Sequence, residues 1–398
     1  MAPSSKVFAD PGVKWALDRA VDLLAVQAMQ LPGLVGTIVY NQTTVWSGSF
    51  GKRRPDKHSD RPRSTDLVRI ASITKTFTDL LAYQMRDAGL IGLDDALAAH
   101  LPHFSMPKAP GARTRGAITL RSLGAHLAGV PREAPWPCSL DEHMCNEEAV
   151  LALLNETLPV MPPYRRFHYS NLGIALLGRA LAHAAGKVAG GGGLPYEALL
   201  AKRILAPLGM ANATFDTAAA VAADHVAAGY HDPEGTQPVN LSQTCTPAPG
   251  APGSWLAPCG CLWASADDLA RLLKLFFRDD APDSTGAAGE QVVDGDTLHE
   301  LLSPAVLMRD GYEAIGEPWE MVRRRRRRRF LLHTTAHHQP PPPFRSTWAM
   351  PRRIGPRASR ASSRATARRC CWSSRSSWAS SSPPSSPMSP PPRCGRST

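Results

Sequence analysis

Long apolar runs are missing from this sequence of 398 residues. No stretch of about 18 consecutive apolar residues occurs, so the sequence predicts no transmembrane segment. Residues 1–20 also lack the basic patch followed by an unbroken apolar stretch that a secretory signal needs. These absences favour a soluble, non-secreted protein with a cytoplasmic location.

Paired cysteine motifs are missing as well. The eight cysteines show neither a regular disulfide framework nor the Cys-x-x-Cys spacing of a zinc site. Cys245, Cys259 and Cys261 fall close together in the sequence, but their spacing does not match a metal site. We therefore expect reduced thiols, no metal and no other cofactor.

Acidic residues and lysine are absent after residue 322. Residues 323–398 begin with seven consecutive arginines, continue as Arg/Ser/Pro-rich sequence and hold 18 of the 45 Lys and Arg residues. Residues 1–322 therefore carry 27 basic and 34 acidic residues, a net charge of −7 that gives no indication of nucleic-acid binding. The tail has no periodic apolar pattern, and we expect it to be disordered because it cannot bury enough apolar surface to offset ordering entropy.

Two hypotheses address this tail. Its composition is typical of a shifted reading frame or a retained intron in GC-rich DNA, in which case it is not the natural continuation of residues 1–322. Alternatively, it is a basic arm that binds nucleic acid with strongly salt-dependent affinity.

The pattern of residues 1–322 predicts a mixed α+β domain. Residues 13–30 have apolar positions at helical spacing, whereas 34–40 and 43–50 are β-branched and aromatic runs typical of a hairpin. Five further helices are expected, joined by Gly/Pro loops: Ile70 to Met85, Glu147 to Glu156, Asn171 to Gly186, Tyr196 to Leu208 and Ala266 to Phe277.

A Ser-x-x-Lys element falls near the first turn of the helix predicted over 70–85. The three-residue spacing of Ser72 and Lys75 places the hydroxyl and the amine on one helix face, close enough for proton transfer. A lysine held out of water loses its proton more readily, and the helix N-terminus favours developing negative charge. Such an element arises by chance about once in a chain of this size, so the alternative is an exposed Ser and Lys on an ordinary amphipathic helix.

Tyr169 and Asn171 form a second polar element just before an apolar helix. At a loop-to-helix junction the phenol can relay protons, and the amide can bind a substrate carbonyl while contacting the lysine. The alternative is a helix N-cap region with a half-buried tyrosine. The two elements in this order are more specific than either one alone.

Seven stretches of residues 1–322, in a fixed order along the chain, indicate a protein family. They are LVGTIVYNQTTVWSGSFG, RIASITKTFT, GLIGLDDALAAHLP, ITLRSLGAHLAGVP, FHYSNLGIALLG, ILAPLGMANATF and PCGCLWASADDLARLL. In this order they resemble the serine beta-lactamases, D,D-peptidases and related esterases, especially the class C-like, beta-lactamase-related branch. The resemblance covers residues 12–320 and implies an α+β fold in which a sheet flanked by helices packs beside a mostly helical region.

The resemblance also implies roles for individual residues. Ser72 is expected to form an acyl-enzyme on an ester, amide or lactam, with Lys75 as the base and Tyr169 as the proton relay. Asn171 is expected to contact the substrate. His126, within AHLAGVP, matches a position that is structural in the family.

The third motif of this family, Lys-Thr-Gly or His-x-Gly, has no match after Trp319. It lies on a strand that walls the cleft and provides one oxyanion-hole amide, and loss of such a donor costs about 10²–10³ in rate. His333, Thr334 and Thr335 lack the glycine. We therefore expect residues 1–322 to form a domain that is incomplete at its C-terminal end, with an exposed sheet edge. The alternative function is a catalytically inactive binding module that keeps the fold.

Overall fold

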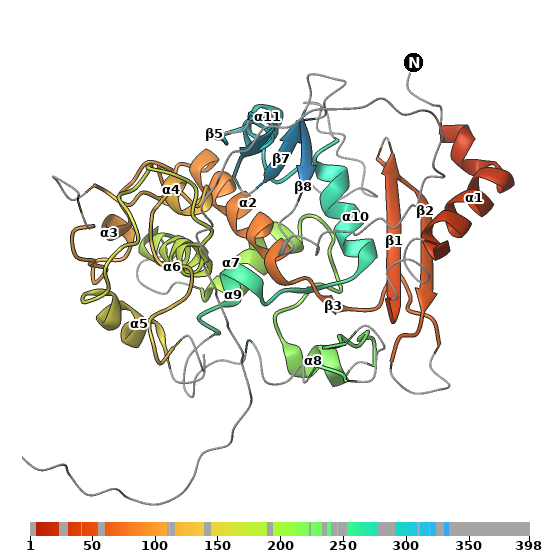
Figure 1. Cartoon of the computed structure of the whole chain (residues 1–398), viewed down its shortest axis with the longest axis horizontal. Coiled ribbons are helices and arrows are strands. Elements are labelled where there is room, and N and C mark those ends of the chain that lie inside the picture. Colours follow the sequence, from red (N-terminus) through yellow and green to blue (C-terminus); the bar gives the residue numbers. More distant parts are fainter. Residues whose placement is uncertain are drawn as a thin grey trace, which may run out of the picture. The chain divides into compact units, whose positions relative to one another are not determined.

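The computed structural model describes most of the chain up to residue 333 (Figure 1). The described residues are 5–23, 31–40, 42–54, 60–109, 111, 116–138, 145–188, 194–222, 224–232, 237–239, 245, 253–277, 291–308, 311–317, 319–323 and 330–333. All of them belong to one compact unit, Met1–Pro340.

The predicted N-terminal hairpin is present as strands β1 (Gly33–Tyr40) and β2 (Thr43–Gly51), which pair antiparallel. Its alternating pattern buries Trp46 and Phe50 of β2. Helix α1 (Pro11–Val21) is joined to this hairpin by a 2.8 Å hydrogen bond from the Trp46 indole to Asp18. The helix was predicted over 13–30, of which residues 24–30 lie outside the described part.

Helix α2 (Thr74–Asp87) forms the centre of the helical region (Figure 1). Every residue from Thr74 to Tyr83 is buried, because α6 (Asn171–Val188), α7 (Tyr196–Leu200) and α9 (Ala257–Gly260) all contact α2. The main hydrophobic core joins the apolar side chains of these helices. The N-terminal end of α2 is therefore held in place by the helices packed around it.

The remaining helices are short. They are α3 (Leu97–His100), α4 (Leu120–Gly124), α5 (Glu147–Leu154), α8 (Thr217–Ala222), α10 (Ala266–Leu275) and α11 (Gly295–Leu301). Capping boxes start α4 at Thr119 and α10 at Ser265. The helix predicted from Tyr196 to Leu208 is instead α7 followed by a π-helical segment, η5 (Ala201–Leu205). No described helix is long and apolar enough to cross a membrane.

Two further sheets use strands too short for sequence periodicity to reveal. Strand β3 (Val68–Arg69) pairs with β4 (Trp263–Ala264), which joins the segment before α2 to the segment after α9. Strands β5 (Val306–Leu307), β6 (Glu313–Ile315), β7 (Glu320–Arg323) and β8 (Phe330–His333) form an antiparallel sheet in chain order.

Strand β8 falls inside the segment that was predicted to have no structure. It pairs along its whole length with β7. The described residues hold β-structure beyond the N-terminal hairpin, because β5–β8 form a sheet of their own. Residues 334–398 lie outside the described residues, and the predicted disorder of that tail stays a prediction.

The expectation of reduced thiols was wrong for four of the body's cysteines. Cys138 is bonded to Cys145, and Cys245 is bonded to Cys261, whereas Cys259 is a buried free thiol. The spacing did not reveal the pairs because folding alone brings position 245 beside position 261. Disulfides persist in oxidising compartments. The expected cytoplasmic location, which rested on the missing apolar runs and signal, stays a prediction.

Candidate active site

Ser72 lies in a single 3-10 turn, η3 (Ala71–Ile73), that leads directly into α2. The sequence had predicted it near the first turn of the α-helix itself. Ala71, the residue before it, has a φ of 46°, a left-handed conformation that costs a residue with a Cβ about 1–2 kcal/mol. A hydrogen bond of 3.0 Å from the Ile70 amide to the Leu262 carbonyl ties this turn to the segment after α9. Strain of this kind concentrates at functional sites and aims the side chain that follows it.

Lys75 enters the site from the first turn of α2 and is almost fully buried, with 1% of its surface exposed. Its Nζ donates hydrogen bonds to Ser72 Oγ at 3.1 Å and to the Cys259 carbonyl oxygen at 2.6 Å. The carbonyl, at the end of α9, fixes the direction of the long side chain. The predicted pairing of serine and lysine on one helix face is therefore present.

Tyr169 meets the same hydroxyl from a segment 97 residues further along the chain, and its phenol donates a 2.7 Å hydrogen bond to Ser72 Oγ. The ring stacks on His126 with a centroid distance of 4.6 Å, and the Arg132 guanidinium lies 4.9 Å from the ring centroid. Folding thus brings the predicted nucleophile, base and relay together around one oxygen atom.

His126 holds this tyrosine in place. It is buried, and its Nδ1 accepts a 3.1 Å hydrogen bond from the Ser170 amide. Burial, together with the positive charge of Lys75, lowers the pKa of His126 to about 3. The imidazole is therefore neutral near pH 7. It is packed and hydrogen-bonded beside Tyr169, which agrees with the structural position that the resemblance implies.

Asn171, the first residue of α6, points its amide toward a carboxylate. Its Nδ2 donates to both oxygens of Glu133, at 2.9 and 3.1 Å, and its backbone amide donates to the Arg132 carbonyl. The predicted contact with Lys75 is absent among the hydrogen bonds of the described residues. Asn171 thus connects the loop that carries Arg132 and Glu133 to the start of α6, beside Tyr169.

Sequence reasoning missed several parts of this arrangement. The Cys259 carbonyl could not have been identified, because a backbone acceptor has no residue-type signature. Nothing in the residue type of Ala71 indicates a left-handed conformation. Arg132 and Glu133 are exposed charged residues of a kind that occurs on most surfaces, and only their position next to Tyr169 and Asn171 distinguishes them.

Of residues 333–335, which lack the glycine of the third motif, only the backbone of His333 is described. His333 ends strand β8, where it pairs with Glu320, and Thr334 and Thr335 lie outside the described residues. Among the described residues, Ser72 Oγ has two proton-carrying groups within hydrogen-bonding distance, the Lys75 amine and the Tyr169 phenol.

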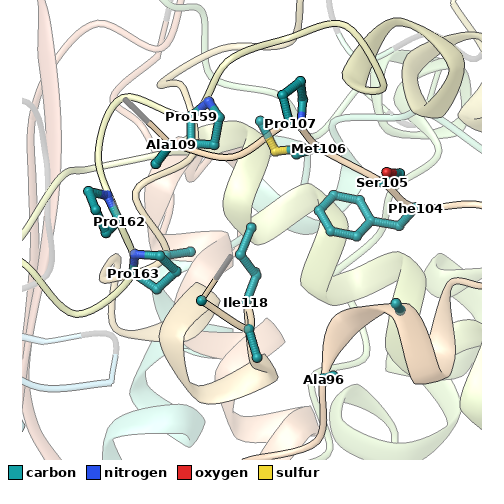
Figure 2. Close-up of a pocket in the computed structure, with 14 residues that line it drawn as sticks. Ala96, Phe104, Ser105, Met106, Pro107, Ala109, Ile118, Pro159, Pro162 and Pro163 are labelled. Carbon is teal, nitrogen blue, oxygen red and sulfur yellow. The ribbon is translucent and has the colours of Figure 1, made fainter. Parts of the chain in front are cut away.

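A separate cavity lies in the helical region, with a volume of about 150 Å³ (Figure 2). Its lining is largely apolar and includes Phe104, Met106 and Ile118 together with Pro159 and Pro163. Neither the nucleophile nor its two partners belong to this lining. The cavity is therefore distinct from the immediate surroundings of the reactive oxygen.

Comparison with known proteins places this geometry in a family. The Beta-lactamase family model matches residues 21–361. Beta-lactamase-like protein 2 of Dictyostelium discoideum is 35% identical over 323 residues, which cover 78% of this chain and 53% of that protein. The D-alanyl-D-alanine-carboxypeptidase/endopeptidase AmpH of Escherichia coli K12 is 33% identical over 181 residues, covering 42% of this chain and 41% of that protein. The chain thus spans about half the length of the curated relatives it matches.

A solved structure agrees at the level of the fold. The class C beta lactamase from Rhodobacter sphaeroides aligns with a TM-score of 0.58 at 22% identity, covering 77% of this chain and 75% of that one. The α+β architecture is therefore the beta-lactamase/transpeptidase-like fold. Because the family model also spans most of its length, the chain belongs to the Beta-lactamase family, which includes serine hydrolases and D-alanyl-D-alanine carboxypeptidases.

Proposed function

We propose that the protein is a metal-independent serine hydrolase or acyl transferase that forms an acyl-enzyme through Ser72. One observation carries this proposal: Ser72 Oγ accepts hydrogen bonds from both Lys75 Nζ and the Tyr169 phenol, at 3.1 and 2.7 Å. A serine hydroxyl becomes a useful nucleophile only when its proton is removed as it attacks. Two groups that can exchange protons are already in contact with the oxygen that would lose one.

The proposed reaction has two steps. In the first, Ser72 Oγ forms a bond to the substrate carbonyl carbon while the neutral amine of Lys75 takes the hydroxyl proton. The bond to the leaving group then breaks, and the Tyr169 phenol gives its proton to that group. The proton taken up by Lys75 passes to the phenolate, which restores both the phenol and the neutral amine. In the second step, water bonds to the acyl carbon and gives a proton to the same pair of groups. The bond from that carbon to Ser72 Oγ then breaks, and the proton passes to Oγ, which restores the free hydroxyl.

The α2 N-terminus supports the negative charge that develops on the carbonyl oxygen, since the first turn of a helix carries positive potential. Asn171 is proposed as the substrate contact, which requires its amide to exchange or share its bonds to Glu133. The proposed substrate class is an ester, amide or lactam. Support for an amide comes from the carboxypeptidase relative in Escherichia coli, and support for a lactam from the Rhodobacter structure.

The proposal is tested by labelling the full chain with a fluorescent penicillin and with a fluorophosphonate. The wild type should become covalently labelled, and Ser72→Ala should lose the label. Ser303→Ala is a matched control, because Ser303 is an exposed serine whose hydroxyl donates to the His299 carbonyl outside the site. Equal labelling of the wild type and Ser72→Ala would discard the proposal.

A second function is supported by the lack of a third-motif sequence after Trp319. A protein without the third motif lacks one oxyanion-hole amide. It would then be a binding module that keeps the fold and binds an ester, amide or lactam without hydrolysing it. Calorimetric binding of such a ligand, with no turnover of nitrocefin or of a panel of p-nitrophenyl esters, would favour this function over hydrolysis.

A further inference from the structure

Helix α2 carries a line of buried polar groups behind the nucleophile. Lys75, Asp79 and Tyr83 follow one another at intervals of four residues, which places them along one face of the helix. Each has no more than 2% of its surface exposed. The same helix also buries three threonines, Thr74, Thr76 and Thr78, and contributes apolar side chains such as Phe77 and Leu80 to the core.

Asp79 occupies the middle of this line in a tightly closed space. A Cβ placed on Gly124 of α4 would come within 2.5 Å of Asp79 Oδ1, so the absence of a side chain at position 124 makes room for the carboxyl group. Leu177 of α6 packs on the same position. Asp79 Oδ2 is buried and has no hydrogen-bond partner among the described residues. An ionised carboxylate in such surroundings is costly unless a cation compensates it.

Among the residues that the structure describes, few charged or titratable groups act on Asp79. Burial, followed by the negative charge of Glu317, raises the pKa of Asp79 well above its usual value, whereas Lys75 lowers it. Tyr196 of α7 also interacts with Asp79, and burial raises the pKa of its phenol. Glu317 is already engaged by Tyr83, whose hydroxyl donates to it at 2.8 Å.

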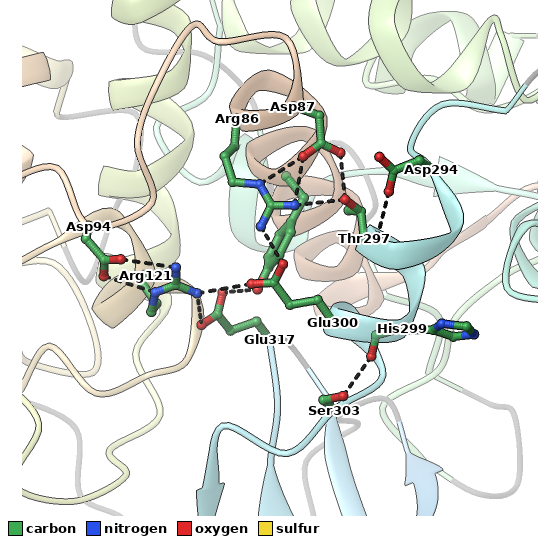
Figure 3. A network of polar contacts seen from close by, with 11 residues as sticks. Arg86, Asp87, Asp94, Arg121, Asp294, Thr297, His299, Glu300, Ser303 and Glu317 are labelled. Carbon is green, nitrogen blue, oxygen red and sulfur yellow. Dashed lines mark hydrogen bonds and ion pairs between the residues drawn. The ribbon is translucent and has the colours of Figure 1, made fainter. Parts of the chain in front are cut away.

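Arg121 completes the surroundings of Glu317. It approaches that carboxylate at 3.7 Å and also pairs with Asp94 and Glu300 (Figure 3). The basic group that acts on Asp79 from within α2 is therefore Lys75, whose Nζ bonds to Ser72 Oγ. Lys75 and Asp79 are one helical turn apart, and both are shielded from solvent.

We infer that Asp79 is a positioning residue for the proposed acyl transfer and acts through Lys75, by determining how readily the lysine holds the proton that Ser72 must exchange. The inference rests on the proposed function of Ser72. When the lysine and the carboxyl group share a single proton, the buried pair has no net charge in either form: ammonium with carboxylate, or amine with carboxylic acid. The second form leaves Lys75 as the neutral amine that accepts the serine proton. The carboxylate of the first form retains the lysine proton and opposes that transfer.

Asp79→Asn tests the inference, because the amide has nearly the same shape and cannot carry the negative charge. The rate of fluorophosphonate labelling is measured against pH for the full chain. The pH at half-maximal rate should move down by about two units, the scale of a unit charge acting over the ~6 Å of one helical turn at an effective dielectric constant of about 20. An unchanged midpoint, with or without a lower maximal rate, would overturn the inference.

Two further variants separate charge from structure. Asp87→Asn makes the same change at the far end of α2, where the carboxylate bonds to Arg86 and Thr297, and should leave the midpoint in place. If Asp79→Asn does not fold, as shown by thermal melting, Asp79→Ala supplies the same loss of charge and should show the same downward shift. Failure of the proposed function is recognised separately, because Ser72→Ala would then label as strongly as the wild type.

Discussion

Replacing Glu317 by glutamine should make the protein less sensitive to alkaline pH. Glu317 lies between β6 and β7, is 5% exposed and accepts a 2.8 Å hydrogen bond from the Tyr83 hydroxyl. Burial raises its pKa to about 7, although the Tyr83 bond and Arg121 act in the opposite direction. In the unfolded chain the same carboxyl group titrates at its ordinary value of 4.5.

The direction in which pH changes the stability follows from the folded and unfolded pKa values of Glu317. Between pH 4.5 and about 7 the folded protein retains a proton that the unfolded chain has released, so the free energy of unfolding falls as the pH rises through this window. Above about pH 7 the free energy of unfolding that the Glu317 proton contributed is fully lost. At 1.36 kcal/mol per unit of pKa, this loss amounts to about 3 kcal/mol. Glutamine does not ionise, and its carbonyl oxygen can still accept the Tyr83 hydrogen bond.

The assay is urea unfolding of the wild type and Glu317→Gln at pH 4 and at pH 8. The free energy of unfolding of the variant, relative to the wild type, should increase by about 2–3 kcal/mol between the two pH values. Glu300→Gln removes a charge from the same network (Figure 3) at a side chain that is 41% exposed, where solvent screening keeps the change small. A variant-to-wild-type difference that stays constant from pH 4 to pH 8 would refute the reasoning.

Two other predictions follow from the site and its supports. Tyr169→Phe removes the 2.7 Å hydrogen bond to Ser72 but keeps the ring that stacks on His126, so the acylation rate should fall by about 10²–10⁴ with little change in melting temperature; an unaltered rate would exclude Tyr169 as the relay. The Cys245–Cys261 disulfide closes a loop of 16 residues, and the double variant Cys245→Ala/Cys261→Ala should lower the free energy of unfolding by about 3 kcal/mol. Equal urea midpoints for this variant and the wild type would contradict the pairing.

The sequence by itself determined the features that depend on neighbours along the chain. The alternation of residues 34–50 predicted the hairpin, and the three-residue spacing of Ser72 and Lys75 placed the hydroxyl and the amine side by side. The order of the short motifs identified the family. These predictions held because side-chain direction within a helix or strand follows directly from spacing.

Only the tertiary structure decided which distant groups meet. It brought Tyr169 to Ser72, placed the Cys259 carbonyl on Lys75 and paired Cys245 with Cys261. The sequence also did not predict strands β3–β8, because elements of two to four residues are too short to show a periodic pattern of apolar residues. Local spacing determines the face on which a side chain lies, but the burial and electrostatics of that side chain depend on the elements packed against it, and these come from other parts of the chain.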